Sequence, residues 1–90
     1  MNDKELGFLK AKCLDAIWNF ENRELKEARF LYNLDRGKGT PFEKICKVNY
    51  DNMLAQSKGM RNAYFSTFGE EVPDTLIEIQ ALASRLECPF

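Results

Sequence analysis

The chain has 90 residues, of which 44% are hydrophobic and 30% charged, and its formal net charge is -1. This length and composition fit one folded domain and exclude a disordered or low-complexity chain. The sequence contains no histidine, the side chain used most often for acid–base catalysis near neutral pH and for binding transition metals. We therefore expect a protein that is not an enzyme and that holds neither a metal nor a cofactor.

The amino-terminal residues are polar and lack the order of a secretory signal, and no apolar run approaches the ~18 residues of a membrane span. Three cysteines, an odd number, are spread over the chain at Cys13, Cys46 and Cys88. This distribution favours reduced thiols packed as small hydrophobic side chains over a disulfide framework. We expect a cytoplasmic protein without membrane contact.

Residues 3–36 are predicted to form the first helix. An apolar row follows spacings of three and four through Leu6, Leu9, Cys13, Ile17 and Phe20. The row meets the polar stretch 21–24 and resumes in another phase at Leu25, so we expect a kink or break near residues 19–24. A straight helix of this length would measure ~50 Å, whereas a compact domain of this size has a radius of gyration of only ~12 Å. Either the helix bends or the molecule is elongated, with apolar surface at its far end that a partner or a second copy covers.

Residues 37–43 predict a turn between two helices. Gly37 and Gly39 tolerate the left-handed backbone that ends a helix, Thr40 is a suitable N-cap, and Pro41 fits the first helical position. Glu43 stands three residues after Thr40, the spacing of a capping box. We expect the chain to double back here.

The second helix is predicted over residues 41–68, with a possible bend at 57–59 because Gly59 is a poor helix former. Gly69 and Pro73 end it, and a third helix over 74–88 begins at Asp74 or Thr75. The fold prediction is one all-α domain, residues 1–90, in which helices 3–36 and 41–68 form an antiparallel hairpin and the third packs across it. Turns occupy 37–40 and 69–73, and we expect a homodimer because one short helix cannot cover both faces of the hairpin.

Charge is segregated along the chain. Residues 1–36 carry seven basic and seven acidic side chains, residues 37–69 carry five and two, and residues 70–90 carry one and five. The net charges are therefore 0, +3 and -4. The simplest interpretation is that the basic middle and the acidic tail attract each other in the fold.

A metal-dependent phosphohydrolase is the weakest functional hypothesis. Glu24 and Glu27, followed by Glu71 and Asp74, resemble the Glu-x-x-Glu and Glu-x-x-Asp elements of all-helical nucleotide pyrophosphatases, which bind magnesium. The similarity is limited to these four residues, and Pro73 lies inside the second element, where a helix is disfavoured. We interpret Glu24 and Glu27 as part of a solvated helix face with alternating charges.

Aromatic and arginine side chains outside the main apolar row are the best candidates for a binding surface, because they offer large contact area at low entropic cost. They are Phe8, Trp18, Arg29, Tyr32 and Arg36. A broader contact with the third helix would explain them equally well. The function favoured by this reading is a non-enzymatic interaction protein of the inhibitor, immunity, antitoxin or adaptor type that binds a protein partner.

The alternative is single-stranded nucleic-acid binding through residues 58–65. Lys58, Arg61 and Tyr64 combine two cations with an aromatic ring and could neutralise phosphates while stacking a base. The stretch is short and the chain has a pI of about 5.4, so this hypothesis ranks second.

Overall fold

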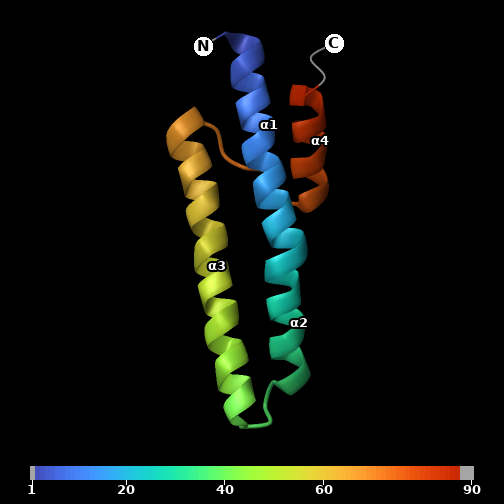
Figure 1. Ribbon diagram of the computed structural model, residues 1–90, viewed down its shortest axis with the longest axis vertical. Helices are drawn as coiled ribbons and strands as arrows, with labels where there is room; N and C mark the ends of the chain where they lie inside the picture. Colours follow the sequence, from blue (N-terminus) through green and yellow to red (C-terminus); the bar gives the residue numbers. More distant parts are fainter. Residues whose placement is uncertain (1, 88–90) are drawn as a thin grey trace.

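The structure is a computed structural model that describes residues 2–87, and within them it is helical without strands. The elements in chain order are α1 Asp3–Asn19, a π-helical segment η1 Phe20–Leu25, α2 Lys26–Asp35, α3 Pro41–Phe68 and α4 Leu76–Glu87. α1, η1 and α2 form one rod, α3 returns antiparallel beside it, and α4 packs along α1 (Figure 1). The predicted all-α hairpin with a C-terminal helix is confirmed.

The π-helical segment lies where the sequence predicts a change of phase in the first rod. It begins where the N–H of Phe20 is shared between the carbonyl groups of Ala16 and Ile17. A π turn contains more residues than an α turn, so it rotates the helix that follows. The rotation allows Leu25 and Ala28 to be buried in the part of the rod that packs on α3. In contrast, α3 runs without interruption through Gly59.

The turn between the rods follows the expected chemistry, with one difference. Gly37 and Gly39 have φ values of 85° and 68°, and the Thr40 hydroxyl accepts the N–H of Glu43 at 3.1 Å. The Glu43 carboxylate does not return to the N-cap itself but accepts the N–H groups of Lys38 and Gly39, at 2.8 and 3.3 Å. The carboxylate thus closes the whole loop.

Both later helix ends also use the predicted residues. Gly69 adopts φ 71° and its N–H donates to the carbonyl of Phe65 at 2.7 Å, which ends α3. The Thr75 hydroxyl accepts the N–H of Glu78 at 3.2 Å, which places the start of α4 after Thr75. Residues 88–90, including the expected last residue of this helix, lie outside the described part of the chain.

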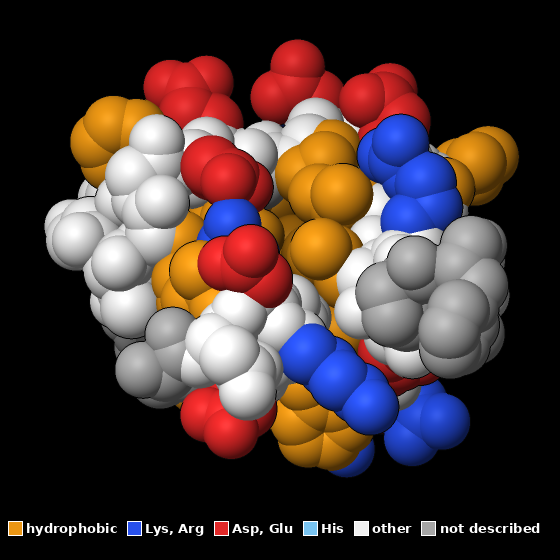
Figure 2. Space-filling model, turned by 90° about the horizontal axis from the view of Figure 1, so that it is seen from above, with side chains coloured by type: hydrophobic (Ala, Val, Ile, Leu, Met, Phe, Trp, Pro, Cys, Tyr) orange, Lys and Arg blue, Asp and Glu red, His pale blue; other side chains and the backbone are white. Residues whose placement is uncertain are grey.

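The main core lies where α1, α3 and α4 meet. Its buried members are Leu14, Ile17, Tyr64, Val72, Ile79 and Ala83. Trp18, Met60 and Phe68 pack against it and remain partly exposed. Seen from the end at which the chain begins, hydrophobic side chains remain visible between the charged ones (Figure 2).

The molecule is elongated. It measures 53 × 22 × 15 Å and has a radius of gyration of 16.0 Å, against ~12 Å for a compact chain of this length. With 12 residues, α4 is only ~18 Å long, so it covers the α1 half of the rod and leaves the α2 half paired with α3 alone. Five large apolar side chains in this two-helix half are at least half exposed: Phe30, Leu34, Phe42, Ile45 and Val48.

Ion pairs do not join the basic middle of the chain to its acidic tail as the charge segregation predicts. Among residues 2–87 the pairs are Lys10–Glu70, Asp35–Lys38 and Glu21–Arg61. The attraction between the two segments is limited to the effect of the Asp74 charge on Arg61, because α4 packs on α1 rather than on α3 and Glu70 pairs with a lysine of α1.

The cysteines differ from one another. Cys46 is a buried thiol, as predicted, whereas Cys13 is exposed, because it lies at the edge of α1 that α4 leaves uncovered. Cys88 lies outside the described residues. None of the described helices combines the length and the hydropathy required to cross a bilayer.

Candidate functional site

The structure brings three of the five predicted partner-binding residues together in the two-helix half of the molecule. Arg29 of α2 donates from Nε to the hydroxyl of Tyr50 on α3 at 3.1 Å, and its guanidinium carbon lies 5.9 Å from the centroid of the Tyr50 ring. The guanidinium of Arg36 lies 5.8 Å from the Tyr32 ring. Arg29, Tyr32, Arg36 and Tyr50 are called the cation–aromatic cluster below.

The two rings of the cluster contact each other across the hairpin. Their centroids are 5.9 Å apart and their planes meet at 61°, an edge-to-face arrangement of the kind that aromatic pairs favour. Both tyrosines are half-buried, whereas both arginines are exposed. The cluster therefore holds two guanidinium groups in place over fixed rings, which lowers the entropy that a partner's binding would cost.

The cluster adjoins a notch beside the first turn of α4. The notch has a volume of about 330 Å³ and its lining includes Leu25, Lys26 and Arg29 from the rod and Leu76 from the first turn of α4. Because Arg29 belongs to both features, the cluster lies on the same side of the hairpin as α4. A partner bound to the cluster can thus also contact this concave, partly apolar notch.

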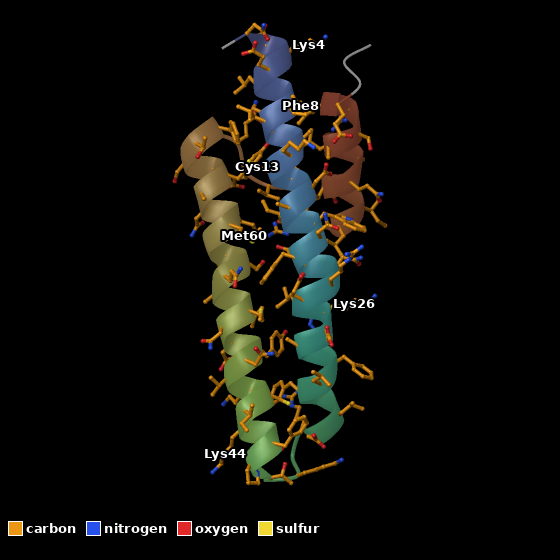
Figure 3. All side chains as sticks on the ribbon, in the orientation of Figure 1. Lys4, Phe8, Cys13, Lys26, Lys44 and Met60 are labelled. Carbon is orange, nitrogen blue, oxygen red and sulfur yellow. The ribbon has the colours of Figure 1, made fainter. Side chains whose placement is uncertain are left out.

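The remaining two predicted residues lie elsewhere. Phe8 is 53% exposed on α1, near the opposite end of the molecule (Figure 3), and the ammonium of Lys12 lies 5.1 Å from its ring. Trp18 packs against the main core, which is the structural alternative considered for it. Neither joins the cation–aromatic cluster.

Sequence reasoning missed Tyr50. Its spacing of four from the buried Cys46 is typical of a core position, and it was not distinguished from the other core aromatics. Its pairing with Arg29 depends on the register between α2 and α3, which the turn geometry sets. No local pattern in the sequence contains that register.

A second polar centre joins η1, α3 and the linker before α4. Arg61 donates from Nε and Nη2 to the two carboxylate oxygens of Glu21, each at 2.7 Å, and from Nη1 to the carbonyl of Pro73 at 2.9 Å. The Ser57 hydroxyl donates to the same carboxylate at 2.6 Å. These contacts are called the Glu21 node.

The node has the electrostatics of a structural ion pair. The Arg61 hydrogen bonds, with a smaller contribution from Ser57, hold the pKa of the Glu21 carboxyl below its ordinary value, although burial acts in the opposite direction. The Glu21 carboxylate raises the pKa of Arg61 in turn. All three guanidinium nitrogens are engaged, so this arginine is not free to bind a phosphate.

The residues of the nucleic-acid alternative do not share a surface. Arg61 is held in the Glu21 node, and Tyr64 is 2% exposed within the core. The ring of Tyr64 is therefore not available for stacking on a base. Of the three, only Lys58 is exposed.

The four acidic residues of the metal hypothesis show no assembled site. Within residues 2–87, no group of three or more His, Cys, Asp or Glu side chains is arranged to hold a metal ion. Glu24 and Glu27 are exposed on the first rod, and Glu71 and Asp74 are exposed on the linker.

Comparison with known proteins gave no match to a family model, to a curated protein or to a solved structure. Functional inference for this chain therefore rests on its own geometry.

Proposed function

We propose that this chain is a non-enzymatic interaction protein, of the inhibitor, immunity, antitoxin or adaptor type, that binds a protein partner through the cation–aromatic cluster. One observation carries the proposal: the first turn of α4 lies beside the start of α2 and the helix runs from there along α1, so the cluster and the adjoining notch lie uncovered on the two-helix half of the rod. Arginine and tyrosine are among the residue types that contribute most to protein interfaces.

The helix that carries the cluster also supports a protein as the partner. Phe30 and Leu34 of α2 are 61% and 55% exposed, and large exposed apolar side chains are typical of a docking surface. A reducing compartment such as the cytoplasm suits the exposed free thiol of Cys13.

The test is affinity capture from cells of the native host with two variants of equal charge change. In Arg29→Gln/Arg36→Gln both guanidinium groups are lost at exposed helical positions, so helical content measured by circular dichroism stays constant. The control Lys4→Gln/Lys12→Gln removes two exposed cations from α1. We expect a protein that the wild type and the control retain and that the arginine variant loses; equal retention by both variants would refute the proposal.

Single-stranded nucleic acid is the alternative occupant of the same cationic surface. A protein interface and a nucleic-acid interface differ in their response to salt, because phosphate binding releases counterions. Retention of a fluorescent oligothymidine that falls steeply between ~50 and ~200 mM salt, and that the arginine variant loses, would favour nucleic acid over a protein partner.

A further inference from the structure

One side of the α1–α3 pair is covered and the other is not. The linker between α3 and α4 crosses α3 at the edge that carries Arg61 and Phe65. These two residues line a second hollow together with Glu71 and Val72 of the linker. Arg61 also donates to the Pro73 carbonyl of the linker. α4 then packs along α1. The covered side is therefore the side of the linker and α4.

The opposite side holds an apolar groove between α1 and α3. Its volume is about 220 Å³ and no charged residue lines it. Its lining consists of Cys13, Ala16, Ile17, Met60, Ala63, Tyr64, Thr67 and Phe68. Cys13 and Met60 lie on the two facing rods, in the space between α1 and α3 (Figure 3). No other element of residues 2–87 lines this groove.

The groove belongs to a longer uncharged row on α3. The row follows steps of three and four along α3 and ends in the groove; its residues are Phe42, Ile45, Asn49, Met53, Gln56, Met60, Ala63 and Thr67. Such spacing keeps side chains on one face of a helix. The row contains no charge over ~38 Å of helix, whereas the other edge of α3 carries Lys44, Lys47, Asp51, Lys58 and Arg61.

The first rod contributes a matching row. Leu6, Leu9, Cys13, Ala16 and Phe20 follow the same alternation of three and four and are also uncharged. Cys13 and Ala16 line the groove together with Met60 and Ala63, so the two rows lie side by side. The rows of α1 and α3 together are called the open face.

The exposure of the open face is unusual for an apolar surface. Phe42 is 51% exposed, Ile45 65% and Leu9 42%. With rod axes about 10 Å apart, the ~38 Å row of α3 and the ~21 Å row of α1 together present on the order of 600 Å². This is at the lower end of the ~600–1,000 Å² that each partner contributes to a stable interface of standard size.

We propose that the open face docks the open face of a second copy of this chain, in an antiparallel dimer in which the uncharged row of α3 packs on the same row of the copy. A two-fold axis across the rods pairs α3 with its own copy and sets the α1 half of each chain against the α2 half of the other. The resulting four-rod bundle leaves α4 and the cation–aromatic cluster on its outer sides. The proposal is thus independent of the proposed function.

The charge distribution favours the antiparallel orientation. Residues 26–51, at the two-helix end, carry six basic and four acidic side chains, a net charge of +2. Residues 70–87, beside the other half of the rod, carry five acidic side chains and one basic one, a net charge of -4. Antiparallel packing brings the positive end of each copy near the negative half of the other, whereas parallel packing places like charges together.

The experiment is sedimentation equilibrium of the full chain from ~1 to ~100 µM, a range in which a dimer with a micromolar dissociation constant dissociates measurably and a tighter dimer stays intact. Ile45→Glu and Ala63→Glu each place a charge on the open face at an exposed position of α3. Ile77→Glu is the matched control, because Ile77 is 81% exposed but lies on α4.

We expect a dimer for the wild type and for Ile77→Glu, and a monomer for Ile45→Glu and Ala63→Glu with unchanged helical circular dichroism. A wild-type monomer at ~100 µM, or dimers of both open-face variants, would overturn the proposal. Salt tests the orientation: an antiparallel dimer weakens as salt is added, and a dimer that strengthens would overturn the antiparallel arrangement. A monomeric chain that still loses its partner in the arginine variant would leave the proposed function standing while this proposal fails.

Discussion

The Glu21 node allows a quantitative test of how η1 is held to α3. In Arg61→Met the guanidinium and its three hydrogen bonds, to the two Glu21 oxygens and to the Pro73 carbonyl, are lost. In Glu21→Leu the carboxylate is lost and Arg61 keeps only its bond to Pro73. The double variant Glu21→Leu/Arg61→Met replaces the whole pair with apolar side chains of similar size.

The magnitude follows from the burial of the pair. The side chains of Glu21 and Arg61 are 11% and 25% exposed, so water replaces the lost partner only in part. A hydrogen bond to a charged group contributes about 1.5–3 kcal/mol net, and an orphaned charge adds a desolvation penalty. We expect each single variant to lose about 2–3 kcal/mol of the free energy of unfolding.

The double variant distinguishes a coupled pair from two independent residues. Because replacement of a buried pair by apolar groups is often nearly neutral, we expect it to lie within about 1 kcal/mol of the wild type. The coupling free energy is then at least about 3 kcal/mol. For comparison, the Asp35–Lys38 pair, whose lysine is 60% exposed, should give a coupling below about 0.5 kcal/mol.

The assay is urea unfolding followed by circular dichroism, with the m-value constant across the series. Free energy losses of the single variants that simply add in the double variant would refute the reasoning. So would a Glu21–Arg61 coupling no larger than that of the Asp35–Lys38 pair.

The same node makes stability depend on pH. The pKa of Glu21 is lowered in the folded chain from its ordinary value of 4.5, so the unfolded chain binds the proton more readily. Its stabilising contribution is complete above about pH 4.5 and is lost as the pH falls through the folded pKa. Glu21→Gln should therefore flatten the stability profile below pH 4.5 and leave its slope near pH 7 unchanged; an equally steep acid loss in the variant would contradict this assignment.

Two further substitutions and one deletion test separate features of the fold. The buried hydroxyl of Tyr64 has no hydrogen-bond partner among residues 2–87, so Tyr64→Phe should keep or raise the free energy of unfolding, by up to about 1 kcal/mol in urea titration; a clear loss would indicate a partner for that hydroxyl. Gly69→Ala should cost about 1 kcal/mol of the free energy of unfolding, because φ is 71° and, in the described part of the chain, no atom beyond its neighbours lies within 4 Å of an added Cβ; a neutral result would contradict the left-handed end of α3. Deletion of Asn22 should convert the π turn to an α turn and leave Leu25 and Ala28 facing α3, because the π turn already accommodates one residue more than an α turn; the thermal midpoint should stay near that of the wild type, and a sharp fall would contradict this account of η1.

Local chemistry accounts for most of the secondary structure. Thr40, Pro41 and the flanking glycines mark the turn because only certain residues satisfy free helix-end groups or tolerate a positive φ, and the structure uses them as predicted. The same holds for Gly69 and Thr75. The change of phase after Phe20 located the irregular segment, although apolar spacing cannot distinguish a π turn from a kink.

The sequence identified only part of the candidate site. Arg29, Tyr32 and Arg36 could be found because their types and spacing set them apart from the apolar row, but Tyr50 became their neighbour only through the register of the hairpin. Conversely, the sequence around Arg61 resembles that around a phosphate-binding arginine. In the folded chain, however, Arg61 is bonded to Glu21, 40 positions away, and this ion pair stabilises the fold.

The length of the elements and their helix ends were encoded locally, residue by residue. The position of α4 was not, because an amphipathic helix specifies that it must bury one face but not against which neighbour. Its packing on α1 covers one side of the hairpin, exposes the other, and leaves the cation–aromatic cluster free. The available binding surfaces are therefore a consequence of tertiary packing, which depends on contacts between segments far apart in the chain.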